Sequence, residues 1–180
     1  MAAAAIFAAV VYPLRATEVD LFSVLDRLTQ APRLDHGDVQ RIVGVRLTQV
    51  PNENSLFDKY SGDGATFTDA VIGLVTFVEP KIELGAMAGP ALLVKIRGGC
   101  ITRPAVEKHY GRLKISVIQT VPEPPRGRAT IPEPANVASY FKTGAWGQLD
   151  FLFDNGGSGC LQRVDLDRPL SAARQNFRTR

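Results

Sequence analysis

The chain has 180 residues, of which 45% are hydrophobic and 22% are charged. This composition is typical of one globular domain or two small ones, and it excludes a disordered chain. The net charge of +3 is mild and the basic residues are scattered among acids, so nothing in it predicts a nucleic-acid partner.

The N-terminus carries an apolar, alanine-rich run at residues 2–12, with the small residue Ala16 a few positions later. The run is too short to span a bilayer, which needs about 20 residues. Its length matches the hydrophobic region of a secretory signal, although the usual basic residues before it are missing. We predict a signal or a disordered segment at residues 1–16, and a periplasmic or secreted protein. A plain N-terminal segment is the alternative.

An amphipathic helix is predicted from Thr17 to Leu28. Thr17 can cap its N-terminus, and Ala31-Pro32 ends it. The apolar side chains that share one stripe and should enter the core are Leu21, Val24, Leu25 and Leu28.

An internal repeat follows, because residues 34–44 align without a gap on residues 101–111. Each copy has an apolar residue, an N-cap residue (Asp35 or Thr102), a short helix and a closing glycine (Gly44 or Gly111). Such glycines are typical of a left-handed helix stop. The same alignment places His109 on the inward face of the second helix, as a core or boundary histidine.

Strand patterns recur after each helix. They cover 47–50, 71–78 and 91–97 in the first copy, and 113–121, 145–152 and 161–167 in the second. A proline-rich loop is predicted between Pro122 and Pro134, and a hairpin connection at 155–159.

The predicted class is therefore α+β. Two tandem units each have a short helix on a roughly four-stranded antiparallel sheet, with an extra helix at the N-terminus. The first unit with its leading helix spans residues 17–99 and the second spans 100–167. A basic C-terminal tail follows at 168–180 and is read as solvated.

The two cysteines are predicted to form a disulfide. Cys100 directly precedes the second helix, and Cys160 has the strand parity of Val164, which points to the helix side. Unpaired buried thiols are an alternative. A metal site with His36 and His109 lacks close ligand spacing, and a catalytic Cys100–His109 pair lacks an orienting partner.

Alternation also assigns the two faces of the second unit's sheet. The side chains expected to cover the helix are Leu149, Phe151, Phe153, Val164, Leu166 and Phe141. The opposite face is expected to carry Tyr140, Lys142, Trp146, Gln148, Asp150, Arg163 and Asp165. Trp, Tyr and Arg dominate protein-binding hot spots, so we predict a protein-binding surface there, with an ordinary solvated face as the alternative.

The same face of the first unit presents Leu74, Val78 and Leu93, which are too apolar to remain in water. We expect them to pack on the other repeat, on a second copy in a homodimer or on a partner.

No catalytic arrangement, metal site or cofactor site is predicted, and we expect the chain not to be an enzyme. Asp150 and Asp165 should lie close together, but nearby Lys142 and Arg163 favour surface ion pairs over an acid/base site. A hydrolase or lyase that uses His109, Cys100 or the carboxylates is the alternative.

The tandem helix-plus-sheet unit, which opens with the motif that runs from Ile101-Thr102 through Val106 to Tyr110-Gly111, resembles the beta-lactamase-inhibitor-protein-like fold. That fold also occurs in small lipoproteins of outer-membrane assembly. The chain departs from it in lacking the lipoprotein cysteine and in its leading helix. The resemblance implies a non-catalytic envelope protein whose sheet face binds an enzyme, a toxin or an envelope component. An inhibitor or immunity-type protein is the first expectation, and a structural accessory of an envelope machine is the second.

Overall fold

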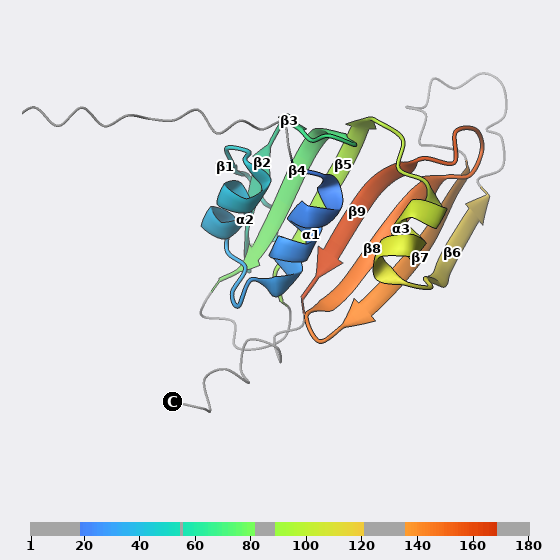
Figure 1. Ribbon diagram of the computed structural model, residues 1–180. Coiled ribbons are helices and arrows are strands. Elements are labelled where there is room, and N and C mark those ends of the chain that lie inside the picture. Colours follow the sequence, from blue (N-terminus) through green and yellow to red (C-terminus); the bar gives the residue numbers. More distant parts are fainter. Residues whose placement is uncertain (1–18, 55, 82–88, 121–135, 169–180) are drawn as a thin grey trace, which may run out of the picture.

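A computed structural model describes residues 19–54, 56–81, 89–120 and 136–168, which fold into a sheet with helices on one side (Figure 1). Within them there are three helices and nine strands, so the predicted α+β class is confirmed. The predicted signal at 1–16, the proline-rich loop at 122–134 and the basic residues after Arg168 lie outside the described residues.

The elements follow the expected order, with strand patterns after each repeat helix. The first half contains α1 (Leu21–Gln30), α2 (His36–Val43), β1 (Thr48–Val50), β2 (Phe57–Gly62), β3 (Ala65–Thr66), β4 (Val71–Pro80) and β5 (Ala91–Gly98). The second half contains α3 (Arg103–Tyr110), β6 (Lys114–Thr120), β7 (Asn136–Gly144), β8 (Gly147–Asp154) and β9 (Leu161–Asp167).

The strands form one antiparallel sheet in the order β1-β2-β4-β5-β9-β8-β7-β6, with β3 paired to β4. The two halves meet edge to edge where β5 pairs with β9, and Ala91 lies opposite Asp167 in that register. Outward from this junction the strands follow in the order β5, β4, β2, β1 on one side and β9, β8, β7, β6 on the other. The last strand of each half is therefore innermost, as expected for two similar units placed side by side. The internal repeat itself stays a prediction.

Helix α1 begins later than predicted. Its N-cap is Asp20, whose carboxylate accepts a hydrogen bond from Ser23 N at 2.7 Å. A carboxylate at the residue directly before the first buried leucine caps the helix well, so the helix runs from Leu21 to Gln30 instead of Thr17 to Leu28. The predicted stripe is confirmed, because Leu21, Val24, Leu25 and Leu28 are all buried.

The repeat helices end at the predicted glycines, but in two different ways. Asp35 caps α2 through Asp38 N at 2.8 Å, and Gly44 closes it in the left-handed conformation (φ 76°, ψ 24°). Gly111 also has a positive φ of 77°, but its ψ of −176° is extended. The predicted left-handed stop is therefore wrong for α3, although the position still requires glycine.

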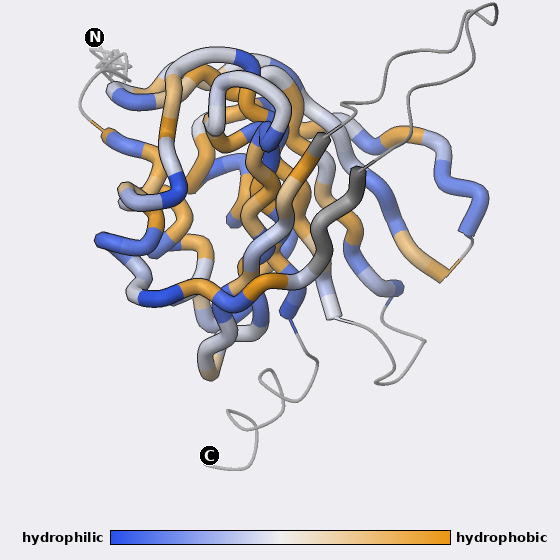
Figure 2. Tube along the Cα trace, turned by 90° about the vertical axis from the view of Figure 1, so that its right-hand side faces the viewer, coloured by the Kyte–Doolittle hydropathy of each residue, from blue (hydrophilic) through white to orange (hydrophobic). Residues whose placement is uncertain are grey.

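One hydrophobic core spans both halves of the chain. It lies between the helices and the helix-facing side of the sheet, and its members include Leu25, Val106, Phe77, Phe151 and Leu166. Viewed from the β6 side, hydrophobic segments run through the strands while hydrophilic ones gather in turns and outer loops (Figure 2). All three helices lie on the same face of the sheet (Figure 1).

Helix α1 joins the two halves on this face. Its first backbone amide, Leu21 N, donates to Asp69 in the first half at 2.9 Å. Its Phe22 ring stacks on His109 of α3 with centroids 4.8 Å apart, and Asp26 lies 2.8 Å from His109 Nε2. The prediction that His109 faces inward is wrong in part: the side chain is exposed, but it is held at the α1–α3 boundary.

The predicted disulfide is present. Cys100 and Cys160 are bonded, with their Cα atoms 4.9 Å apart and 60 positions apart in the chain. Cys160 is buried, and its backbone forms a bridge to Thr102 at the start of α3. The bond therefore fixes the start of α3 to the end of the β8–β9 hairpin.

Removing this bond through Cys100→Ser with Cys160→Ser should lower the free energy of unfolding by about 2–5 kcal/mol, because the open loop gains entropy when the chain unfolds. Urea denaturation followed by circular dichroism would measure the change. Since one core spans both halves, we expect a single transition rather than a surviving first unit.

Reductant is the matched treatment for the disulfide prediction, because it should destabilise the wild type and leave the double variant unchanged. Equal urea midpoints for the oxidised wild type and the double variant would contradict the prediction.

Candidate functional site

The side of the sheet away from the helices forms the open face, and no described helix lies over it (Figure 1). The strand register arranges its side chains in rows that cross the sheet. One row at the β7–β8 turn end contains Thr143, Gln148, Asp167, Ala91 and Val78. The next contains Phe141, Asp150, Asp165, Leu93 and Thr76, and a third contains Ser139, Leu152, Arg163, Lys95 and Leu74.

Apolar side chains lie on both flanks of the open face. Leu74, Val78 and Leu93 lie on β4 and β5, and Phe141 and Leu152 lie on β7 and β8. All five are half-buried by their neighbours. The predicted packing of the first three onto the other repeat is wrong, because the two halves join through strand edges and leave these side chains on a free face.

A charged strip on β8 and β9 separates the apolar flanks. Arg163 Nη2 lies 2.9 Å from Asp165 Oδ2, and Gln148 Nε2 donates to Asp150 at 2.7 Å. Asp150 and Asp165 face each other directly across the two strands. Like charges in that position destabilise a sheet, so the strip is stable only because Arg163 and Gln148 offset part of the repulsion.

The pKa values of two carboxyls in the strip are raised. For Asp165 the main cause is burial, which Arg163 opposes and which Asp150 and Asp167 reinforce. For Asp167 burial raises the pKa, and the charge of Asp150 adds to it. Asp165 Oδ1 and Arg163 Nε are buried without a hydrogen-bond partner among the described residues. Asp165 Oδ1 would gain from a hydrogen-bond donor, and Arg163 Nε from an acceptor.

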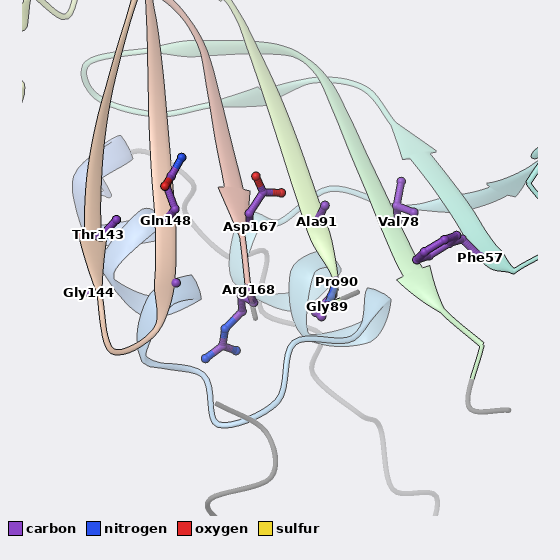
Figure 3. A pocket seen from close by; sticks show the side chains of 11 residues that line it. Phe57, Val78, Gly89, Pro90, Ala91, Thr143, Gly144, Gln148, Asp167 and Arg168 are labelled. Carbon is purple, nitrogen blue, oxygen red and sulfur yellow. The ribbon is translucent and has the colours of Figure 1, made fainter. Parts of the chain in front are cut away.

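A hollow of about 760 Å³ lies at the end of the open face near the β7–β8 turn. Figure 3 shows Thr143, Gln148, Asp167, Ala91, Val78 and Phe57 side by side on neighbouring strands. Pro90 and Arg168 complete the lower rim. One side of the hollow is thus apolar and is formed by β2, β4 and β5. The other side is polar and includes Asp167 at the end of the charged strip.

The predicted binding residues divide into three groups. Gln148, Asp150 and Arg163 lie together on the open face as expected, with Asp165 beside them. Tyr140 and Lys142 lie on the helix side, because they pair with the buried Phe151 and Leu149. Their assignment to the open face is wrong.

Side-chain contacts agree with this register. The Tyr140 hydroxyl accepts a hydrogen bond from Arg103 of α3 at 3.1 Å, and Lys142 reaches Gly111 at the end of that helix. Phe141 was expected on the helix side, but it pairs with Asp150 on the open face. The predicted alternation of β7 is therefore shifted by one residue from the observed one. Such a shift moves every side chain of the strand to the other face.

Trp146 is not on a strand. It lies in the two-residue turn between Gly144 and Gly147, half-buried against the core, and its carbonyl accepts a hydrogen bond from Arg168 Nε at 3.4 Å. This short turn was the signal that could have placed β7 correctly. Counting back from a Gly144–Gly147 pair puts Phe141 opposite Asp150.

The residues considered for catalysis lie elsewhere. Cys100 is bonded to Cys160 and offers no thiolate nucleophile. His109 contacts Asp26 and Phe22 on the helix layer, and His36 contacts Glu79 at 3.1 Å and stacks on Tyr60. Each histidine therefore connects a helix to a neighbouring element. Neither histidine forms a site with the carboxylates of the charged strip.

The described ranges contain no cluster of metal ligands and no membrane-spanning helix. No cluster of three or more His, Cys, Asp or Glu side chains in them is arranged to hold a metal ion. No helix there combines the length and apolar character needed to cross a membrane. Comparison of the chain with protein-family models, curated proteins and solved structures found no match.

Replacing Arg163 with Gln should raise the pKa of Asp165 further, because the variant loses the cation that opposes the effect of burial. Carboxyl-carbon NMR titration would measure the shift. A carboxyl whose pKa is higher in the folded than in the unfolded state costs stability once it ionises. The free energy of unfolding should therefore fall more steeply in the variant than in the wild type as the pH rises above about 4.

Arg97→Gln supplies a control for this titration, since Arg97 lies on β5 outside the strip. An unchanged or lowered pKa of Asp165 in Arg163→Gln would show that the ion pair does not control this carboxyl.

Proposed function

We propose that the chain is an exported protein-binding module that holds its partner on the open face of the sheet. The observation that carries this proposal is the face itself: five half-buried apolar side chains border a charged strip, and no described element covers them. Large apolar patches with a polar component mark interaction sites on soluble proteins.

Export is supported by the disulfide, because such bonds persist in oxidising compartments and are rare in the cytosol. The signal-like run at residues 2–12 points the same way. We therefore propose the periplasm or the exterior of the cell as the site of action.

An inhibitor or immunity-type protein is the role we favour within this class. The support is the resemblance to the beta-lactamase-inhibitor-protein-like fold, in which a sheet face grips an enzyme. The two tandem halves here form one continuous sheet wide enough to oppose a whole partner domain. A structural accessory of an envelope machine would use the same face, so the identity of the partner distinguishes the two roles.

The binding residues we now propose combine earlier and new candidates. Gln148, Asp150 and Arg163 remain, and Phe141 and Leu93 replace Tyr140 and Lys142, which contact the helix layer. Trp146 lies in the β7–β8 turn and packs against the core. Aromatic and arginine side chains surrounded by contacts that exclude water are the usual source of binding energy.

The double substitution Leu93→Thr with Phe141→Thr should weaken binding of the partner at least tenfold, because it removes apolar contacts while the introduced threonines still favour a strand. The measurement is recovery of a stoichiometric complex from envelope extract of the source cells, followed by titration of the purified partner.

Ile115→Thr is the matched control. Ile115 is 60% exposed on the edge strand β6, and its register partner is Tyr140 on the helix side. The complex should survive in this control. Equal loss in both variants, or none in the double variant, would rule out the open face as the binding surface. An inhibitor would also abolish the activity of the captured enzyme, and a scaffold would not.

A further inference from the structure

The third row of the open face places two cations side by side. Lys95 on β5 lies directly opposite Arg163 on β9, and like charges in that position destabilise a sheet. Arg163 contacts Asp165, but Lys95 and the exposed Arg97, two positions further along β5, form no ion pair within the described ranges. This part of the face therefore carries positive charge that the described chain leaves unbalanced.

An apolar side chain lies at each end of the cation pair. Strands β8, β9, β5 and β4 are neighbours in the sheet (Figure 1), and the row that crosses them reads Leu152, Arg163, Lys95, Leu74. Both leucines are half-buried. Because neighbouring strands lie about 4.8 Å apart, the two leucine positions are about 14 Å apart, with the two cations midway between them. We call these four residues the cationic row.

An extended segment of another protein has the dimensions of this row. Alternate side chains of an extended chain point to the same side and lie about 6.8 Å apart, so positions i, i+2 and i+4 span about 14 Å. An apolar residue, an acid and a second apolar residue at these positions would contact Leu152, the two cations and Leu74 in turn. The spacing and the charge of the row therefore fit the same simple pattern.

The neighbouring row restricts the occupant to a single carboxylate. Asp150 and Asp165 lie opposite each other one row away from Arg163, about 7 Å along the strands, and they would repel a second negative charge. A nucleic-acid backbone carries one charge per phosphate and therefore fits this face poorly. The leucines that flank the cations also favour a protein segment, since apolar surface beside polar groups is typical of protein interfaces.

We propose that the partner presents an extended segment with the pattern apolar-x-acid-x-apolar, whose carboxylate binds Lys95 and Arg163. This inference rests on the proposed function, because it takes the open face as the binding surface, and it adds the chemistry of the partner. In the free protein the two cations repel each other. In the complex both attract the same carboxylate, so the arrangement that destabilises the free sheet favours binding.

The first experiment measures the repulsion in the protein alone. Lys95→Gln should raise the urea midpoint at low salt, because it removes the like charge opposite Arg163, and the rise should disappear at about 1 M salt. Lys59→Gln is the matched control, since Lys59 lies on the same face but has Val50 and Val78 as its register partners. Its midpoint should not change. An unchanged or lower midpoint for Lys95→Gln would overturn the proposal, because Lys95 would then already be neutralised within the chain.

The second experiment titrates the protein with the synthetic peptide acetyl-Thr-Leu-Thr-Glu-Thr-Leu-Thr-amide and follows the amide NMR signals. The shifts should centre on the cationic row and saturate with a Kd on the order of 1 mM at low salt. Replacing the glutamate of the peptide with glutamine should weaken binding by about threefold or more, because the ion pair is lost. Lys95→Gln should weaken binding of the glutamate peptide to a similar extent, and Lys59→Gln should not.

Several results of the titration would overturn the proposal. They are the absence of saturable shifts, equal binding of the glutamate and glutamine peptides, and shifts that centre instead on the cleft between α1 and α2, which Arg27 and Arg41 line. Tighter binding of tripolyphosphate than of the glutamate peptide would also overturn it, since the occupant would then be a polyanion.

The two proposals fail separately. If Leu93→Thr with Phe141→Thr abolishes the complex with the captured partner while Lys95→Gln leaves it intact, the open face is the binding surface and the acidic pattern is wrong. If the glutamate peptide binds the cationic row while the complex survives Leu93→Thr with Phe141→Thr, the row binds the predicted segment and the proposed use of Leu93 and Phe141 is wrong.

Discussion

The pairing of β5 with β9 is the constraint on which the rest of the structure depends. It joins the last strand of each half edge to edge, so that two small sheets become one wide sheet. A face-to-face arrangement of the halves would have buried both sheet faces. Because the halves meet at their edges, the three described helices share one side and one core, and none of them lies on the other side.

The same junction also assembles the chemistry of the open face. Strand β9 carries Arg163, Asp165 and Asp167, and β5 supplies Leu93 and Ala91 directly opposite the two aspartates. Polar and apolar groups that are far apart in the chain thus become neighbours at 4.7–4.9 Å strand spacing. Partial burial by these neighbours explains why the pKa values of Asp165 and Asp167 are raised even on a face that no described helix covers.

The candidate site could be predicted only in part, for a reason visible in β7. Tyr140 and Phe141 are adjacent aromatic residues, and either could serve as the core side chain. Periodicity alone does not choose between them, and a shift of one residue exchanges the two faces. The hairpin turn between Gly144 and Gly147 decides the register, and it sends Tyr140 to Arg103 and Phe141 to the open face. Strand β8 has clear alternation, so Gln148 and Asp150 were placed correctly.

Local signals in the sequence were sufficient for the helices, most strand positions and the class of the fold. Asp35 and Gly44 delimit α2 through their own backbone preferences, and the buried stripe of α1 follows from its spacing. The Cys100–Cys160 bond was also predictable, since strand parity and position placed both residues beside α3. Only the tertiary structure decided that the halves share one sheet and one core, because strand order depends on contacts between distant segments. It likewise decided that Leu74, Val78 and Leu93 lie on the same face as a charged strip, since no local pattern encodes which edges pair.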